Sequence, residues 1–276
     1  MSNLLARLLT AVVVIPVLVL AIYWSNPIGV WAIVITATAI GLREWMRMTL
    51  QRGDGVERWF GVVAGTAYAA AWYWFSESAG VVPVALAAAV IGVFLFFLFR
   101  YREIESVATR TAFVVCGILY ATLITFLALL KKRPEGDGGA WIYISLTIAW
   151  LSDTGAYFTG RFLGKIWPRK LYETVSPKKT LVGAIGGLAG SFLGLVIAKL
   201  WYLKTLSWVD CALIAVPANI LGQTGDLAES LVKRSVGVKD SGALLPGHGG
   251  MLDRIDALLF VVPYVFAYAR WVYGRF

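Results

Sequence analysis

Residues 81–99 read VVPVALAAAVIGVFLFFLF and contain no charged side chain. An α-helix rises about 1.5 Å per residue, so a helix of this length approaches the roughly 30 Å thickness of a bilayer's hydrocarbon core. The stretch therefore predicts a transmembrane helix, and comparable stretches recur along the 276 residues. We expect an all-α fold, that of a polytopic integral membrane protein.

Nine stretches are long and apolar enough to span: 4–24, 28–48, 59–75, 81–99, 112–130, 141–162, 181–203, 208–223 and 257–273. The eighth is short, carries Pro217 and Asn219, and ends in the polar run 222–226. We expect it to be broken or to enter a water-filled cavity, and the count falls to eight if it does not cross. We divide the chain into N-terminal spans over 1–140 and a catalytic region over 141–276, with a cytoplasmic loop at 225–256.

The composition excludes an ordinary soluble domain, because 59% of the residues are hydrophobic and only 15% are charged. The net charge of +9 comes from dispersed Lys and Arg residues, which argues against a nucleic-acid partner. A cytoplasmic N-terminus places 18 of the 25 basic residues inside, with the cluster at 131–133 as an exception. Cys116 and Cys211 lie in apolar runs, where we expect buried packing residues.

Acidic residues gather near the C-terminus, where five of the 16 fall within 226–256 beside the only histidine, His248. If residues 226–234 are helical, Asp226, Glu229, Ser230 and Lys233 share one face, and Glu229 and Lys233 form an i,i+4 pair. The alternative is a solvated amphipathic helix at the membrane surface.

A glycine-rich loop at 239–250 leads into the last expected span. Asp253 and Asp256, three residues apart, share a helical face and could hold a hard divalent cation, for which Mg²⁺ is best suited. The alternative is a tight loop in which aspartates cap a helix.

Two upstream elements are further candidates. Asp153 lies inside an expected span, where an ionised carboxylate is costly and marks a functional site unless Ser and Thr hold it for packing alone. Residues 176–180 read SPKKT, and we expect Pro177 to start a helix whose lysines, Lys178 and Lys179, bind phosphate. Topology and lipid headgroups would explain these lysines equally well. The glycines at 183, 186, 187, 190 and 194 predict close helix packing.

The C-terminal residues also resemble a known family. The run SLVKR at 230–234, KDSG at 239–242 and LPGHGGMLDRID at 245–256 is similar to the signature of phosphatidate cytidylyltransferases, also called CDP-diacylglycerol synthases. SDTGAY at 152–157 and the SPKKT run resemble the bacterial branch, whereas the first 140 residues resemble it only as generic spans. Val182 departs from the family, in which many members carry an acidic or amide side chain there.

The resemblance implies Mg²⁺-dependent transfer of CMP from CTP to phosphatidic acid, with a second cation possible, in a bacterial inner membrane with the active site facing the cytoplasm. Membrane lipids are partners, and a homodimer is possible. We assign metal binding to Asp226, Asp253 and Asp256, with Asp240 either as an additional ligand or as a residue that supports the ligands. The resemblance supports a paired cation centre near Asp226 and Asp253. Phosphate groups would be bound by the following residues: Lys233, Arg234, Lys239, Arg254, Lys178, Lys179, Ser176 and His248. Asp153 would line the polar cavity.

Three other functions fit parts of the sequence. An ion-coupled transporter could use Asp153 and a broken eighth span, but it predicts acidic residues in several spans rather than one cluster. A polyprenol kinase would also use CTP, but would release CDP. A non-catalytic scaffold gives no reason for the charges gathered at 226–256.

Overall fold

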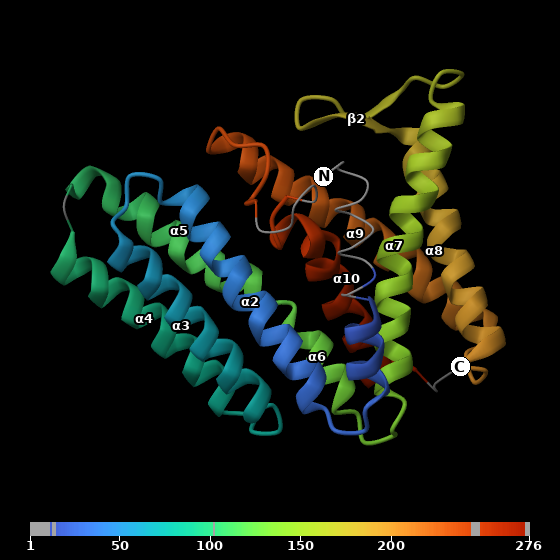
Figure 1. The fold of residues 1–276 in the computed structure, drawn as a ribbon, viewed down its shortest axis with the longest axis horizontal. Coiled ribbons are helices and arrows are strands. Elements are labelled where there is room, and N and C mark those ends of the chain that lie inside the picture. The colour runs from blue at the N-terminus through green and yellow to red at the C-terminus, as the bar shows by residue number, and fades with distance from the viewer. Residues whose placement is uncertain (1–11, 13–14, 102, 244–248, 274–276) are drawn as a thin grey trace. The chain divides into compact units, whose positions relative to one another are not determined.

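The computed structural model describes residues 12, 15–101, 103–243 and 249–273, which are almost entirely helical (Figure 1). They form two compact units, one of residues 1–129 with 236–254, the other of residues 130–235 with 255–276. The all-α expectation is confirmed apart from a short hairpin. The functional division expected near residue 140 stays a prediction.

The first unit is built on α2 (Ile28–Thr49), α3 (Gly55–Trp74), α4 (Val81–Arg100) and α5 (Ile104–Thr122), followed by α6 (Thr125–Lys131). Small residues let these helices approach closely. A Cβ atom on Gly65 would lie 2.7 Å from Leu42 and 3.3 Å from Ile118, so α2, α3 and α5 meet at this glycine. The indole of Trp45 donates a hydrogen bond of 2.8 Å to the carbonyl oxygen of Phe113, which fastens α2 to α5.

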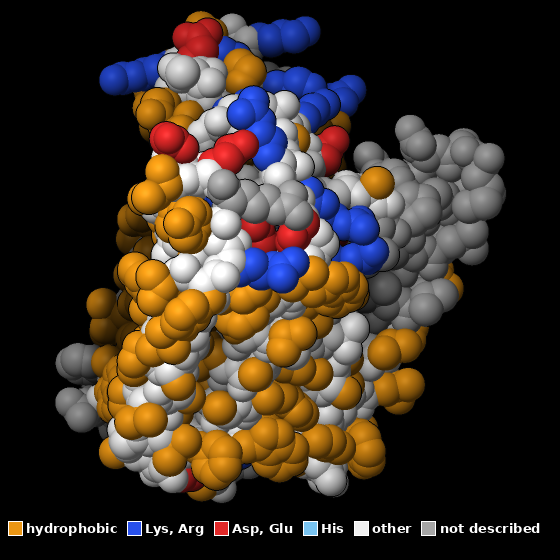
Figure 2. All heavy atoms as spheres, turned by 90° about the vertical axis from the view of Figure 1, so that its left-hand side faces the viewer, with side chains coloured by type: hydrophobic (Ala, Val, Ile, Leu, Met, Phe, Trp, Pro, Cys, Tyr) orange, Lys and Arg blue, Asp and Glu red, His pale blue; other side chains and the backbone are white. Residues whose placement is uncertain are grey.

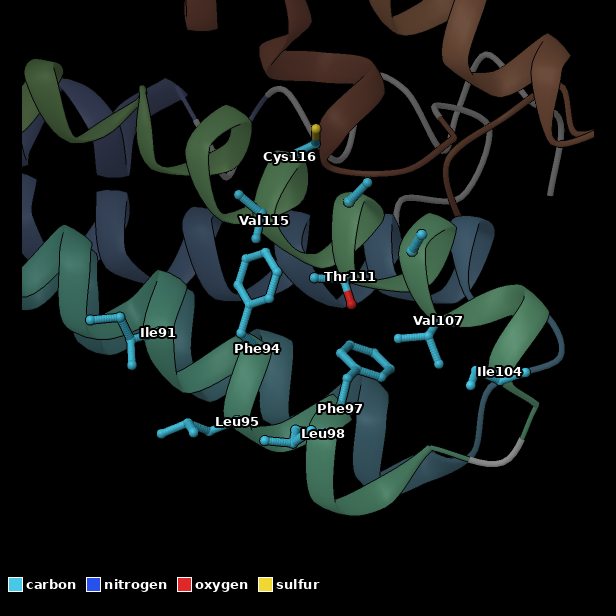
Figure 3. Close-up of a pocket in the computed structure, with 12 residues that line it drawn as sticks. Ile91, Phe94, Leu95, Phe97, Leu98, Ile104, Val107, Thr111, Val115 and Cys116 are labelled. Atoms are coloured by element: carbon cyan, nitrogen blue, oxygen red, sulfur yellow. The ribbon is translucent and has the colours of Figure 1, made fainter.

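Helix α4 exposes most of its apolar surface, as expected for a helix that faces lipid. Figure 2 shows a broad hydrophobic surface with charged side chains gathered beyond one end of it. An apolar cavity of about 890 Å³ lies between α4 and α5, where Phe94 and Phe97 face Val107 and Val115 (Figure 3). Cys116 lines this cavity and is exposed, so the expectation that it is buried is wrong, whereas Cys211 is buried. The cavity beside Cys116 is open, which leaves this side chain exposed.

The second unit contains α7 (Gly138–Leu163), α8 (Leu181–Trp201), α9 (Trp208–Ser235) and most of α10 (Leu252–Trp271). Helices α7 and α8 run side by side in contact (Figure 1). A Cβ atom on Gly190 would overlap the carbonyl oxygen of Leu151, and one on Gly186 would overlap the Thr159 hydroxyl. The predicted role of these glycines in helix packing is confirmed.

Strands β1 (Lys170–Tyr172) and β2 (Ser176–Thr180) form an antiparallel hairpin between α7 and α8. The expectation that Pro177 starts a helix is therefore wrong. Proline lacks an N–H group but is tolerated in a two-stranded sheet, where every strand is an edge. Helix α8 begins at Leu181, because the Thr180 hydroxyl accepts a 3.1 Å hydrogen bond from the Gly183 amide and caps the helix.

Helix α9 runs unbroken through Pro217 and the polar run 222–226, so the expected break is wrong and residues 225–235 are not a loop. A proline inside a helix leaves the carbonyl four residues earlier without its N–H partner. That carbonyl belongs to Leu213, and the Tyr264 hydroxyl of α10 donates a 2.5 Å hydrogen bond to it. The replacement bond explains why the helix continues.

Four helical stretches among the described residues are long and apolar enough to cross a membrane: Ile28–Thr49, Val81–Arg100, Ile104–Lys131 and Leu181–Trp201. Their number and composition support an integral membrane protein. The expected fifth span, 112–130, lies within Ile104–Lys131, which has a turn at residues 123–124 between α5 and α6. Of the first expected span, residues 15–23 are helical and the rest lies mostly outside the described residues. The count of nine spans stays a prediction.

Candidate active site

Asp226 of α9 and Lys179 of β2 form an ion pair in the second unit. Each side chain keeps about 30% of its surface exposed, at 30% for Asp226 and 28% for Lys179. The carboxylate and the ammonium group are therefore both accessible to a ligand. This contact brings together two segments that the sequence singled out separately.

The C-terminal part of α9 confirms the face expected for residues 226–234. Lys233 donates a 2.9 Å hydrogen bond to Glu229, and both side chains are buried. The Ser230 hydroxyl lies 3.4 Å from Asp226. The pair is withdrawn from solvent and supports α9 from the inside, and the predicted contact of Lys233 with substrate phosphate stays a prediction.

Asp256 of α10 lies near the carboxylates of α9, just before the expected span 257–273. Loss of solvation raises its pKa well above the usual range, and the negative charges of Asp226, Glu229 and Asp153 raise it further. The Ala257 amide, which donates a 2.7 Å hydrogen bond to the carboxylate, opposes these contributions. This corner of the unit thus has an excess of negative charge that a cation would relieve.

A buried polar network supports the same helices. The side-chain oxygen of Asn219 accepts hydrogen bonds from the Ser152 hydroxyl at 2.8 Å, the Ser191 hydroxyl at 3.2 Å and the Gln223 amide at 3.2 Å. Gln223 also donates a 3.0 Å bond to the carbonyl oxygen of Ala184. The network joins α7, α8 and α9 one to two turns from Asp226, and so fixes the position of that residue.

In the first unit, Asp253 lies at the start of α10 and one of its oxygens accepts three hydrogen bonds. The donors are the Ser241 amide at 2.9 Å, the Ser241 hydroxyl at 3.0 Å and the Gly250 amide at 2.8 Å. Asp253 thus closes the glycine-rich segment onto the helix, as in the capping alternative. Its role as a metal ligand stays a prediction.

The other predicted site residues lie mostly on the surface. Ser176 is half-buried, and six side chains are exposed: Asp153, Lys178, Arg234, Lys239, Asp240 and Arg254. His248 lies outside the described residues, so its predicted role is untested. Exposure suits residues that meet a soluble nucleotide or a lipid headgroup.

The oxygen chemistry of the second unit fits the expected Mg²⁺. Asp226 and Asp256 supply carboxylate oxygens, which are the ligands Mg²⁺ prefers, and waters or substrate phosphates complete its shell. The pKa of Asp256 is raised by burial and by the negative charge of the neighbouring carboxylates, and a bound cation would offset that charge. Among the described residues, no group of three or more His, Cys, Asp and Glu side chains is placed to hold a metal ion, so the three-carboxylate set stays a prediction.

Sequence reasoning missed Glu44, the buried carboxylate of α2, although a signal was present. Glu44 lies within the expected span 28–48, where an ionisable residue marks a functional candidate by default. The reasoning that singles out Asp153 applies equally to Glu44. Gln223 belongs to the polar run 222–226 that predicts a broken span, but in the fold it is part of a hydrogen-bond network.

Residues 5–272 match the sequence model of the Cytidylyltransferase family. The chain belongs to the Cytidylyltransferase family. A relative from Brucella suis named phosphatidate cytidylyltransferase is 33% identical over 263 residues, which cover 94% of this chain and 90% of the relative.

Other family members of the same name match over a shorter region. The Staphylococcus saprophyticus protein is 41% identical over 152 residues, or 55% of this chain and 56% of the relative. The Bacillus subtilis protein is 36% identical over 160 residues, or 57% of each. The chain spans just over half of the length of these two relatives.

Proposed function

We propose that this protein is a phosphatidate cytidylyltransferase, which transfers CMP from CTP to phosphatidic acid and releases pyrophosphate and CDP-diacylglycerol. The observation that carries the proposal is the likeness to the Brucella suis relative over nearly the full length of both chains. The ion pair of Lys179 and Asp226 also supports the proposal, because it brings together a lysine, which can bind phosphate, and a carboxylate, which can bind a metal ion.

The chemistry requires no protein nucleophile. The phosphate monoester of phosphatidic acid has a second pKa near about 6, so it is largely dianionic at neutral pH. One of its oxygens forms a bond to the α-phosphorus of CTP, and the bond from that phosphorus to the bridging oxygen of the β-phosphate breaks. Pyrophosphate leaves with the electron pair. The protein must align two polyanions and neutralise the charge of both.

Asp226 and Asp256 would hold Mg²⁺, with Asp253 and Asp240 as further ligands and a second cation possible. The bound cation would neutralise the phosphates and orient them for in-line displacement. Lys179, beside Asp226, would bind a phosphate that approaches the same carboxylate. Lys178, Arg234, Lys239 and Arg254, all exposed, would contact the outer phosphates, together with Ser176 and His248.

The finer localisation belongs to the same proposal. We place the protein in the bacterial inner membrane with about nine spans, among membrane lipids, and we propose that it can form a homodimer. The active site would face the cytoplasm, where CTP is found. The bacterial origin of the relatives and the apolar helices support this placement.

The proposal is tested by incubating purified protein in detergent with phosphatidic acid, Mg²⁺ and CTP, UTP, ATP or dCTP in turn. We expect pyrophosphate and CDP-diacylglycerol with CTP. A polyprenol kinase would instead release CDP from CTP, and a transporter would release no pyrophosphate. Either result contradicts the proposal.

A further inference from the structure

Glu44 of α2 holds a segment of chain about 200 residues further on, within the first unit. Its two carboxylate oxygens accept hydrogen bonds from the Met251 amide at 2.9 Å, the Leu252 amide at 2.9 Å and the Ser241 hydroxyl at 3.2 Å. Only 6% of Glu44 is exposed. A buried carboxylate satisfied by three donors is a specific arrangement, because each lost bond would leave charge without compensation.

Two of these donors are backbone amides at the start of α10, which begins at Leu252. The first amides of a helix have no partner within the helix, and the helix dipole favours negative charge at this end. A residue next to the helix start usually supplies the cap. Here a carboxylate from α2 does so, and the direction of the first turn of α10 therefore depends on α2.

Glycines allow the chain to pass close to Glu44. A Cβ atom on Gly242 would lie 2.6 Å from a Glu44 oxygen, and one on Gly250 would lie 2.5 Å from the other. One turn earlier on α2, Gly41 makes room for Leu252. A Cβ atom on Gly41 would lie 3.0 Å from the Leu252 side chain. The segments on both sides of residues 244–248 thus lie against one face of α2.

Ser241 connects Glu44 to Asp253. Its single hydroxyl hydrogen lies within reach of Glu44 at 3.2 Å and of Asp253 at 3.0 Å. The backbone amide of Ser241 also donates to Asp253, at 2.9 Å. Displacing Glu44 would therefore change the donors that orient the Asp253 carboxylate.

We propose that Glu44 is a positioning residue of the cytidylyltransferase site: its carboxylate joins α2 to Ser241 and to the first turn of α10, and so fixes the direction of Asp253. Glu44 acts through these residues and does not itself touch substrate. The part of this proposal that concerns activity rests on the proposed function, whereas the part that concerns the backbone does not.

The test variant is Glu44→Gln, which keeps the shape but removes the charge and turns an N–H₂ donor toward backbone amides. We expect amide hydrogen exchange in a peptide covering 249–253 to accelerate at least tenfold, without Mg²⁺ or substrate. Exchange in a peptide covering 186–194 of α8 should stay within twofold of wild type. We expect kcat to fall at least tenfold while KM for CTP changes less than threefold.

The matched control is Glu105→Gln, the same change at an exposed position of α5, which should alter neither readout. A general loss of stability would accelerate exchange in both peptides and would contradict the proposal, as would wild-type exchange at 249–253. If Glu44→Gln does not fold, Gly242→Ala decides in the same way, because the three atoms nearest to its Cβ atom would all belong to the Glu44 side chain, which it would displace. If wild-type protein shows no cytidylyl transfer, the proposed function fails, yet the exchange measurement still judges the role of Glu44.

Discussion

Lys179 and Asp226 form an ion pair across 47 residues of sequence, joining the β-hairpin before α8 to the middle of α9. Both groups are partly exposed, so the pair is not a buried structural bridge. An exposed pair contributes little to stability, commonly less than about 1 kcal/mol. We interpret it as a prepared arrangement in which the ammonium neutralises a carboxylate until a ligand engages both.

The two lysines of β2, Lys178 and Lys179, should differ in importance. Replacing Lys179 with Met should lower kcat/KM for CTP at least about 100-fold, because an interaction with a phosphate in a partly desolvated site is worth several kcal/mol. Lys178→Met, the same change at the exposed neighbour, should cost less than about tenfold. Turnover of radiolabelled CTP into CDP-diacylglycerol measures both. Equal losses would show that the pairing with Asp226 does not set the role of Lys179.

Asp226→Asn should reduce turnover below about 10% of wild type at any Mg²⁺ concentration, since the loss of a metal ligand costs several kcal/mol. The variant should fold normally, because Asp226 is partly exposed and its ion pair adds little stability. Thermal unfolding in detergent provides the control. Turnover above that level in a folded variant would exclude Asp226 as a metal ligand.

Asp256→Asn should abolish activity and yet stabilise the protein in the absence of divalent cations. The pKa of Asp256 is raised in the folded state by loss of solvation and by the neighbouring carboxylates, so its ionised form disfavours folding. The neutral isostere removes that cost. We expect the midpoint of thermal unfolding in EDTA at pH 7.5 to rise by a few degrees.

The sign of the pH dependence follows from the same shift. A carboxyl with a raised folded-state pKa stabilises the fold below its unfolded pKa of about 4, and this stabilisation is lost as the pH rises through the folded pKa. The difference in unfolding midpoint between Asp256→Asn and wild type should be near zero at about pH 4 and grow toward neutral pH. Mg²⁺ should raise the midpoint of wild type only. A difference that shrinks with rising pH would contradict the assignment.

Tyr264→Phe should destabilise the second unit by about 1 kcal/mol, the typical net contribution of an intramolecular hydrogen bond. The Tyr264 hydroxyl satisfies the Leu213 carbonyl that Pro217 leaves without its helical partner. In a Pro217→Ala background an N–H group becomes available for that carbonyl, so the effect of Tyr264→Phe should be smaller. The free energies of unfolding of wild type, the two single variants and the double variant measure the coupling between Tyr264 and Pro217. Additive effects of the two substitutions would contradict this coupling.

The sequence predicted the helices well, because long apolar runs admit few other structures in a membrane. The second, fourth and seventh expected spans begin where α2, α4 and α8 begin. The wrong predictions concern two prolines, at each of which another residue decides the local structure. Pro217 predicted a break that Tyr264 prevents from another helix, and Pro177 predicted a helix start that Thr180 supplies three residues later.

The candidate site was predicted in part. The spacing of Glu229 and Lys233 predicted their contact, since four residues make one helical turn. No spacing rule connects Lys179 to Asp226 or Glu44 to Leu252, because these contacts depend on how helices pack. Glu44 is the clearest case: the sequence shows a charge within an apolar run, but only the fold shows which amides it accepts from.

The central claim is that Asp226 and Asp256 bind a divalent cation beside Lys179. It is tested most directly by an experimental structure of the protein with Mn²⁺ and a non-hydrolysable CTP analogue, in which anomalous scattering locates the metal. We predict a peak within about 2.0–2.4 Å of carboxylate oxygens of both Asp226 and Asp256, with a nucleotide phosphate completing the shell. A peak bound elsewhere, or bound nucleotide with neither carboxylate on the metal, would contradict the account.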